Sequence, residues 1–157
     1  MTQSEYKLEQ ALIKQLTGKG KEDDAYYDFV SIANEQQMLD NLKCQLEKHN
    51  NIEHQPFSPD EFKRIITHLT KSNSVFERAE ILRDKYPLKR DDGSLKYISF
   101  LNTSKWCMNE YQITNQVTQH NAEQNTHKTR FEVTLLINGL PLVQIELKRR
   151  GLELKEA

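Results

Sequence analysis

The stretch RFEVTLLINGLPLVQIELKRRG, residues 130–151, decides the fold because it predicts a β-hairpin. Two runs of apolar and β-branched residues flank an asparagine–glycine turn, and successive side chains of a strand point to opposite faces. One side of each strand is therefore apolar and suits a core. The other side carries Glu132 in the first strand and Glu146 and Lys148 in the second.

The length of the turn decides whether the two carboxylates share a face. A two-residue turn pairs Glu132 with Ile145 and separates Glu132 from Glu146. A three-residue loop ending in a G1 bulge pairs Glu132 with Gln144, so that Glu146 is a diagonal neighbour on the same face. We expect the three-residue loop, with Gly139 at positive φ, because it keeps the apolar residues in register. The expected apolar pairs are Val133 with Val143 and Phe131 with Ile145.

Two converging carboxylates repel each other, and a divalent cation removes that conflict. Hard oxygen ligands suit Mg²⁺. Lys148, two residues beyond Glu146, can then orient an attacking water or stabilise charge on a phosphate. This is the E-x-K arrangement of metal-dependent nucleases. The alternative interpretation is a strand face whose charges are simply solvated.

The rest of the chain places helices before most of the strands, which predicts an α/β or α+β domain. Ser58, Pro59 and Glu61 predict a capped helix start, and Asp92-Gly93 predicts a turn. An amphipathic segment after residue 151 stops early, so we expect a C-terminally truncated domain. Helices are predicted over 4–16, 36–49, 58–69 and 74–84, and strands over 26–32, 97–101, 110–119, 130–137 and 141–148.

Length and composition limit the possible classes of protein. The 157 residues suggest one domain, and 22 basic against 23 acidic residues give no overall basic excess. No apolar run has the length of a membrane span, and the first residues do not resemble a signal peptide. Two cysteines without metal-site spacing indicate reduced thiols in a cytoplasmic protein. Trp106 with Tyr111 fits a base-stacking surface or, as we favour, packing.

The segment FEVTLLINGLPLVQIELKRRGLELKEA, residues 131–157, resembles the N-terminal nuclease region of the R (motor) subunit of type I restriction endonucleases. The words NGLPLV and ELK are its most specific parts. The opening SEYKLEQALIKQL, residues 4–16, also resembles the first helix of that family. The resemblance covers essentially residues 1–157, with helices in 4–84 and the sheet in 97–148.

The resemblance implies a PD-(D/E)xK fold, in which a mixed sheet is flanked by helices. It places the catalytic residues at Glu132, Glu146 and Lys148, with Mg²⁺ held by the two glutamates. A further acid found on the first helix of some relatives falls on Glu9 or Glu5. The adjacent Arg149 and Arg150 are candidates for contact with DNA phosphates, or else they form a solvated strand end.

The sequence departs from the family pattern in three respects. Glu132 replaces the usual aspartate, and its side chain is longer by one methylene. The Gln-x-x-x-Tyr motif that follows E-x-K in the family is absent, as are the helicase motor domains. No phosphate-binding GxxxxGK[ST] motif occurs, so ATP would act only through domains outside this chain.

The implied function is that of a Mg²⁺-dependent endonuclease domain of an R subunit, which cleaves unmodified double-stranded DNA in the cytoplasm. The implied partners are the modification and specificity subunits, with no membrane. The alternative is an inert fragment or interaction module with the nuclease fold. A metal titration separates the two, because a ligand that binds the native state raises the melting temperature.

Overall fold

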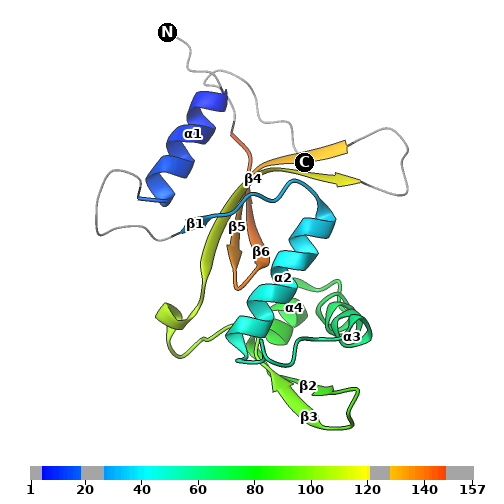
Figure 1. Ribbon diagram of the computed structural model, residues 1–157. Helices are drawn as coiled ribbons and strands as arrows, with labels where there is room; N and C mark the ends of the chain where they lie inside the picture. Colours follow the sequence, from blue (N-terminus) through cyan, green and yellow to red (C-terminus); the bar gives the residue numbers. More distant parts are fainter. Residues whose placement is uncertain (1–4, 19–26, 121–127, 148–157) are drawn as a thin grey trace. The chain divides into compact units, whose positions relative to one another are not determined.

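The computed structural model describes residues 5–18, 27–120 and 128–147 and has a mixed α/β architecture (Figure 1). The chain divides into two compact units. The first comprises residues 1–38 and 111–157, and the second comprises residues 39–110. The predicted fold class is confirmed, since helices accompany a mixed sheet of the restriction-endonuclease-like kind.

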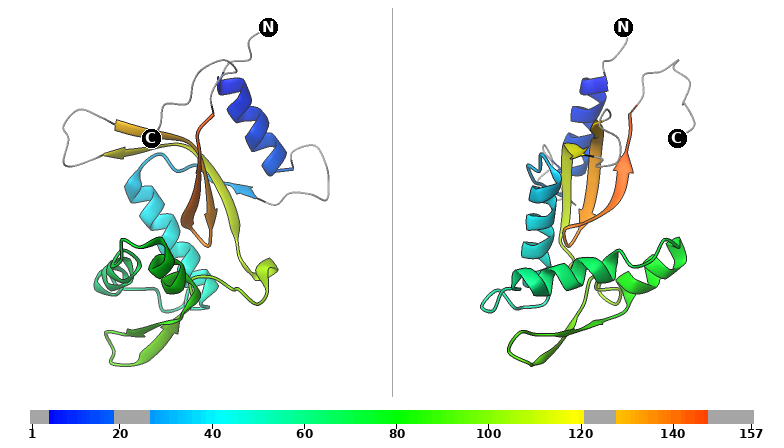
Figure 2. Two further views of the ribbon diagram at one scale, coloured as in Figure 1. Left: turned by 180° about the vertical axis from the view of Figure 1, so that it is seen from behind. Right: turned by 90° about the vertical axis from the view of Figure 1, so that its right-hand side faces the viewer.

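The first unit is built on a four-stranded sheet in the order β1-β4-β5-β6. The short strand β1 (Asp28–Phe29) runs parallel to β4 (Tyr111–His120). Strand β4 is antiparallel to β5 (Lys128–Ile137), which is antiparallel to β6 (Leu140–Ile145). The views of Figure 2 show β4, β5 and β6 side by side, with β6 as an edge strand. The strand predicted over 26–32 is therefore reduced to two residues.

Two apolar clusters fix the sheet of the first unit. Helix α1 (Glu5–Leu16) contributes Ile13 to one cluster, and the segment after β1 contributes Ile32 to the other. The two β5 residues in these clusters are an odd number of positions apart, so strand alternation points them to opposite faces. The buried members are Ile13, Ile113 and Val133 in the first cluster, and Ile32, Val117 and Leu136 in the second.

The hairpin of β5 and β6 differs from the expected register, and the reason lies in its turn. Asn138 and Gly139 both have positive φ, 50° and 79°, which defines a two-residue turn of the I′ kind. The predicted positive φ of Gly139 is confirmed, but the predicted three-residue loop is wrong. Asparagine tolerates the left-handed conformation better than most residues, so the turn closes without a third member.

A bulge in β6 then changes the register. Leu136 pairs with Pro141, but Leu135 pairs with Val143, so Leu142 is an extra residue. A proline has no N–H to donate to the ladder, which makes an edge strand with a bulge a suitable place for it. Beyond the bulge Val133 pairs with Ile145, and not with Val143 as predicted.

The second unit begins within helix α2 (Glu35–His49) and continues through α3 (Pro59–Leu69) and α4 (Val75–Arg83). Strands β2 (Tyr86–Lys89) and β3 (Leu95–Ile98) form a separate two-stranded sheet, followed by the short 3-10 helix η1 (Trp106–Met108). Strand β2 was not predicted, and the strand predicted over 97–101 lies in this hairpin and not in the main sheet. Within the described residues, no helix has both the length and the apolar character needed to cross a membrane.

The start of α3 confirms the predicted capping box. The Glu61 N–H donates to Ser58 Oγ at 3.2 Å, and the Glu61 carboxylate accepts from the Ser58 N–H at 3.0 Å. Glu61 is nevertheless buried, with 2% of its surface exposed. A buried carboxylate needs further partners to offset its lost hydration.

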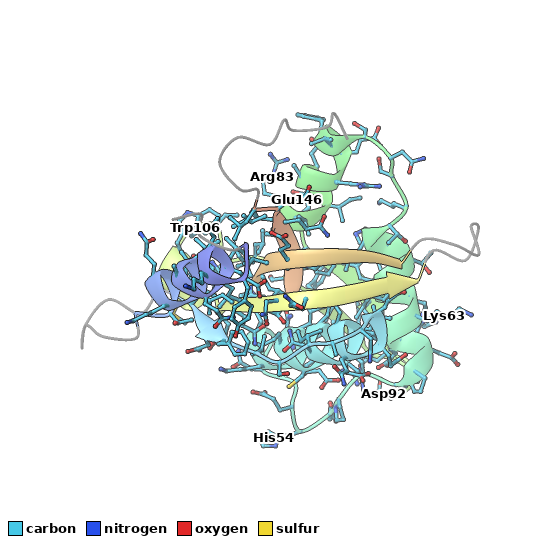
Figure 3. The ribbon with its side chains drawn as sticks, turned by 90° about the horizontal axis from the view of Figure 1, so that it is seen from above. His54, Lys63, Arg83, Asp92, Trp106 and Glu146 are labelled. Atoms are coloured by element: carbon cyan, nitrogen blue, oxygen red, sulfur yellow. The ribbon has the colours of Figure 1, made fainter. Side chains whose placement is uncertain are left out.

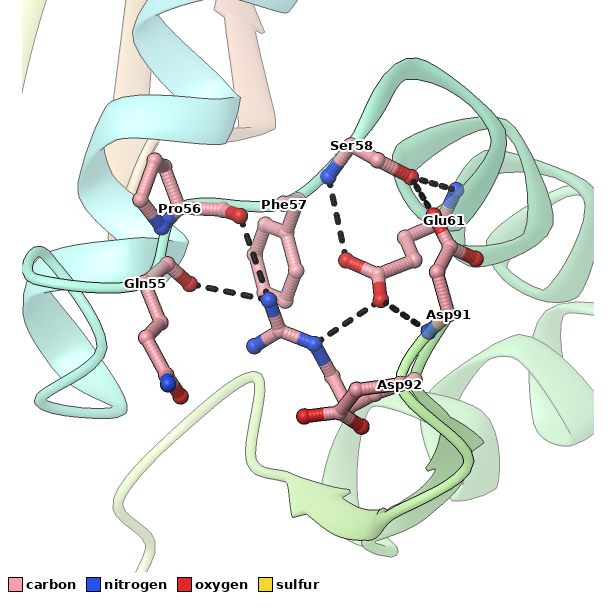
Figure 4. Close-up of a pocket in the computed structure, with 8 residues that line it drawn as sticks. Gln55, Pro56, Phe57, Ser58, Glu61, Asp91 and Asp92 are labelled. Atoms are coloured by element: carbon pink, nitrogen blue, oxygen red, sulfur yellow. Dashed lines mark hydrogen bonds and ion pairs between the residues drawn. The ribbon is translucent and has the colours of Figure 1, made fainter.

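Arg90 and Asp91 supply those partners. Figure 4 shows Asp91 beside the carboxylate of Glu61. Arg90 Nε donates to the Glu61 carboxylate at 2.9 Å, and the Asp91 N–H donates to it at 2.8 Å. Burial alone raises the pKa of Glu61, but the N–H groups of Asp91 and Ser58 and the Arg90 guanidinium outweigh it. Together they hold the pKa of that carboxyl below its usual range.

We predict that Arg90→Met lowers the free energy of unfolding by roughly 3–5 kcal/mol at pH 7, because it leaves a buried carboxylate without its cation. The depressed pKa of Glu61 makes its contribution fully present above the ordinary glutamate value of about 4.3. That contribution is lost as the pH falls through the lower, folded-state pKa. Urea unfolding of parent and variant from pH 7 downwards should therefore show the difference shrinking in acid.

The matched control is Arg64→Met, which removes the exposed 3.0 Å ion pair with Asp91. Exposed pairs contribute about 0–1 kcal/mol. If Arg64→Met and Arg90→Met lowered the free energy of unfolding equally, the buried ion pair would have no special role in stability.

Candidate active site

The carboxylate of Glu132 reaches from β5 to the end of β6. Glu132 is partly buried, and its Oε2 accepts a hydrogen bond from the backbone N–H of Leu147 at 2.5 Å. Leu147 lies between Glu146 and Lys148, the two other residues predicted for the site. The longer side chain of glutamate thus spans the distance to the neighbouring strand.

Glu146 follows directly after β6 and is exposed (Figure 3). The last ladder pairs are Thr134 with Gln144 and Val133 with Ile145. If this register continued for one more step, Glu146 would lie directly opposite Glu132, and not diagonally as predicted. In that register the two carboxylates would share a face, because the bulge adds one residue to a two-residue turn, but the paired region ends at Ile145.

Opposed positions of an antiparallel pair have Cβ atoms about 4.5–5.5 Å apart, and like charges placed there destabilise the pair. The hydrogen bond from the Leu147 N–H offsets part of this cost at Glu132. A divalent cation between the carboxylates would offset the rest. The predicted positions Lys148, Arg149 and Arg150 lie outside the described residues.

The donor chemistry of this hairpin end fits Mg²⁺. Protein sites for Mg²⁺ commonly use one or two carboxylates and leave the remaining positions to water and substrate phosphates. Among the described residues no group of three or more histidine, cysteine, aspartate or glutamate side chains could hold a metal ion. A metal site at the predicted Glu132 and Glu146 would thus rest on two carboxylates, with the remaining positions open to water and substrate.

Glu9, the candidate acid of the first helix, is buried, with 3% of its surface exposed. Its carboxylate accepts hydrogen bonds from Asn115 Nδ2 at 2.5 Å and from Gln116 Nε2 at 2.8 Å. Gln116 has φ 61°, and Asn115 and Val117 on either side of it pair with Val133 and residue 131. Gln116 therefore sits across the ladder from Glu132, so α1 is anchored beside the candidate site.

Asn115 and Gln116 were not predicted as partners of Glu9. Their only signal was a pair of amide side chains in the middle of a predicted strand, where alternation gives no reason for two consecutive polar residues to share a partner. The left-handed conformation of Gln116 turns its side chain to the same partner as that of Asn115.

The two aromatic residues singled out in the sequence behave differently. Tyr111 packs edge-to-face against Tyr27, with ring centroids 5.8 Å apart, as the packing interpretation expected. Trp106 is 53% exposed, so packing was the wrong expectation for it (Figure 3).

We predict that Glu9→Ala lowers the free energy of unfolding by about 2–4 kcal/mol, because two hydrogen bonds to a charged group are lost. Glu9→Gln should cost less, since its amide oxygen still accepts one of them. Gln10→Ala, at an exposed position of the same helix, is the control and should be nearly neutral. Chemical denaturation measures all three. An unchanged stability for Glu9→Ala would show that the buried carboxylate does not anchor α1.

A mixed sheet accompanied by helices is consistent with the class of restriction-endonuclease-like proteins. Residues 2–157 match the model of the family described as type I restriction enzyme R protein N terminus, and the chain belongs to that family.

Named relatives agree with this assignment. The chain is 50% identical to the type I restriction enzyme SsaAORF53P endonuclease subunit of Staphylococcus saprophyticus and 48% identical to the SauMSSORF170P endonuclease subunit of Staphylococcus aureus. Each match covers 99% of this chain and 16% of the relative. The type I restriction enzyme EcoprrI endonuclease subunit of Escherichia coli is 38% identical, over 99% of this chain and 47% of the relative. The chain thus spans less than half the length of these relatives.

Proposed function

We propose that this chain is the nuclease module of a type I restriction enzyme R subunit and that it hydrolyses phosphodiesters of unmodified double-stranded DNA with Mg²⁺. The observation that carries the proposal is the end of the β5–β6 hairpin. There the Glu132 carboxylate bonds to the Leu147 backbone, and Glu146 would face Glu132 if the ladder continued one step beyond the pair of Val133 with Ile145. Membership of the family and the names of the relatives support the same activity.

Glu132 and Glu146 would hold the metal, and the Leu147 N–H orients the first of these carboxylates. When bound, Mg²⁺ stabilises charge on a phosphoryl oxygen and makes a bound water more acidic. Lys148 is assigned to the attacking water or to the phosphate, because it follows Glu146 by two residues and carries no ligand oxygen. Arg149 and Arg150 are assigned to neighbouring phosphates of the DNA.

The proposal includes the setting in which the module works. Specificity and modification subunits would bring the DNA, and ATP would act through motor domains of a longer subunit. The length of the relatives supports this, because each extends well beyond the matched region. A cytoplasmic location accompanies a DNA substrate, and both cysteines are free thiols.

The roles of Glu146 and Lys148 can be separated. Calorimetric titration of this chain with Mn²⁺ should show affinity falling on the order of tenfold or more for Glu146→Ala, because a ligand is lost. Lys148→Ala should bind metal as well as the parent or better, since a nearby cation disappears. Without metal, Glu146→Ala should be as stable as the parent or slightly more stable, because an opposed like charge is removed.

Cleavage is tested in a chimera in which this chain replaces the matching region of the S. saprophyticus subunit, assembled with its partner subunits. Both alanine variants should reduce plasmid cleavage by about 10²-fold or more while ATP hydrolysis continues. Gln144→Ala, at an exposed position of β6, is the control and should cleave normally. Cleavage by Glu146→Ala at the parental rate would mean that the hairpin is only a charged strand face and that the chain is an inert module.

A further inference from the structure

The second unit contains a polar groove of about 950 Å³ that the proposed chemistry does not use. Four separated parts of the chain line it: the end of α2, the junction of α4 and β2, strand β3, and the segment 99–110. All of them belong to residues 39–110, so the groove lies within one compact unit.

The groove is electropositive although the whole chain carries a formal charge of -1. Five cationic side chains line it against two carboxylates. Two of these cations have carboxylate partners: Lys48 Nζ lies 2.6 Å from a Glu110 carboxylate oxygen, and the Arg83 guanidinium lies 3.5 Å from Glu80 and 3.4 Å from Asp84. The positive excess of the groove therefore rests on three lysines, against the carboxylate of Glu53. Within the described part of the chain, no ion pair links a carboxylate to Lys85, Lys96 or Lys105. The five cations are Lys48, Arg83, Lys85, Lys96 and Lys105.

The loop on one side of the groove is held rigidly by two asparagines. Asn109 is buried, and its side chain bonds to the N–H and the carbonyl of Asn102 at 2.8 and 3.0 Å. The Asn102 side chain in turn accepts from the N–H groups of residues 104 and 105 at 3.2 and 2.9 Å. This loop presents Lys105 and Trp106 to the outside in a defined position.

A third asparagine, Asn50, links the end of α2 to the segment after β3 through two hydrogen bonds. Asn50 Oδ1 accepts from the Ser99 N–H at 2.8 Å, and Asn50 Nδ2 donates to the Ser99 carbonyl at 3.0 Å. Both residues line the groove. The groove is therefore built before any ligand arrives, which reduces the entropy lost on binding.

Exposed aromatic side chains accompany the positive charge. Tyr97 on β3 is 58% exposed and lines the groove. Trp106 in η1 is 53% exposed and follows the lining residue Lys105 in the chain. Large aromatic side chains fixed in solvent are expected at a binding surface, because they offer contact area with little loss of conformational freedom. In nucleic-acid interfaces, lysines and small polar side chains contact phosphates and sugars, and aromatic side chains stack on bases.

We propose that this groove binds the phosphodiester backbone of DNA outside the catalytic hairpin. That the DNA is the nuclease substrate rests on the proposed function; the affinity of the groove for the backbone does not. An acidic protein would match the charge but would not use the exposed aromatic pair. Lys85, Lys96 and Lys105 contact phosphates, and Trp106 lies against the sugar or base edge.

Trp106 is the only tryptophan in the sequence, so its fluorescence reports directly on this loop. Titration of the 157-residue chain with a 30-base-pair duplex in EDTA should change that fluorescence and saturate. The variant Lys85→Gln, Lys96→Gln, Lys105→Gln should bind at least about tenfold more weakly at low salt. The slope of log affinity against log salt should fall by up to about 0.9 for each phosphate contact removed.

The matched control removes the same charge elsewhere in the second unit. Lys63, Lys71 and Lys89 are exposed and do not line the groove, so changing all three to glutamine should leave the fluorescence change and affinity near parental values. Circular dichroism checks that both triple variants are folded. If the groove variant fails to fold, Lys85→Gln with Lys105→Gln is used, because both positions are exposed whereas Lys96 is partly buried.

The remaining arms separate the possible ligands. A single-stranded oligonucleotide shows whether the groove prefers duplex or single strand, and either form supports backbone binding. If both triple variants lost DNA affinity equally, the proposal would be overturned. It would also be overturned if polyglutamate changed the fluorescence as much as DNA does. Metal binding is measured by calorimetry without DNA and DNA binding is measured in EDTA, so failure of the groove and failure of the metal site give different results.

Discussion

The pairing of β5 with β6 is the constraint on which the candidate site depends. A two-residue turn at Asn138-Gly139 would by itself separate Glu132 from Glu146, since side chains alternate along each strand. The extra residue Leu142 shifts the alternation of β6 by one position relative to β5. The Glu132 carboxylate accepts a hydrogen bond from the backbone N–H of Leu147. In the proposed metal site, this one inserted residue on an edge strand is what would allow the two acids to share a cation.

The parts of this arrangement that follow local rules were predictable. Asparagine followed by glycine predicts a tight turn, and Ser58 with Glu61 predicts the capping box that the structure contains. The bulge was not predictable from the apolar pattern, because a three-residue loop satisfied that pattern equally well. Only the paired strands show that Pro141 is followed by an unpaired residue.

Long-range polar contacts also could not be predicted from the sequence. The Glu9 carboxylate meets two side chains more than 100 positions away, and the left-handed conformation of Gln116 has no signature in a strand-like run. The same holds for the groove of the second unit. Its lysines lie at positions 48 to 105 without forming a basic run. The near-neutral net charge of the chain therefore gave no sign of a local excess of positive charge.

The two units suggest a division of labour within the chain. The sheet of the first unit carries the carboxylates, and the groove of the second unit offers charge and aromatic contact area without an acid pair of that kind. Binding energy from contacts away from the reacting bond is a general means of positioning a substrate. Each unit can be tested separately, because metal binding and DNA binding are measured under different conditions.

The central claim is that Glu132 and Glu146 form one divalent-metal site. Paramagnetic broadening of amide NMR signals by substoichiometric Mn²⁺ tests it most directly, with Mg²⁺ as the diamagnetic reference. The account predicts that the Leu147 amide, which donates to Glu132, broadens first, and that Glu146→Ala removes the effect. Earlier broadening at another acidic site, such as Asp91 and Asp92, or unchanged broadening in Glu146→Ala, would contradict it.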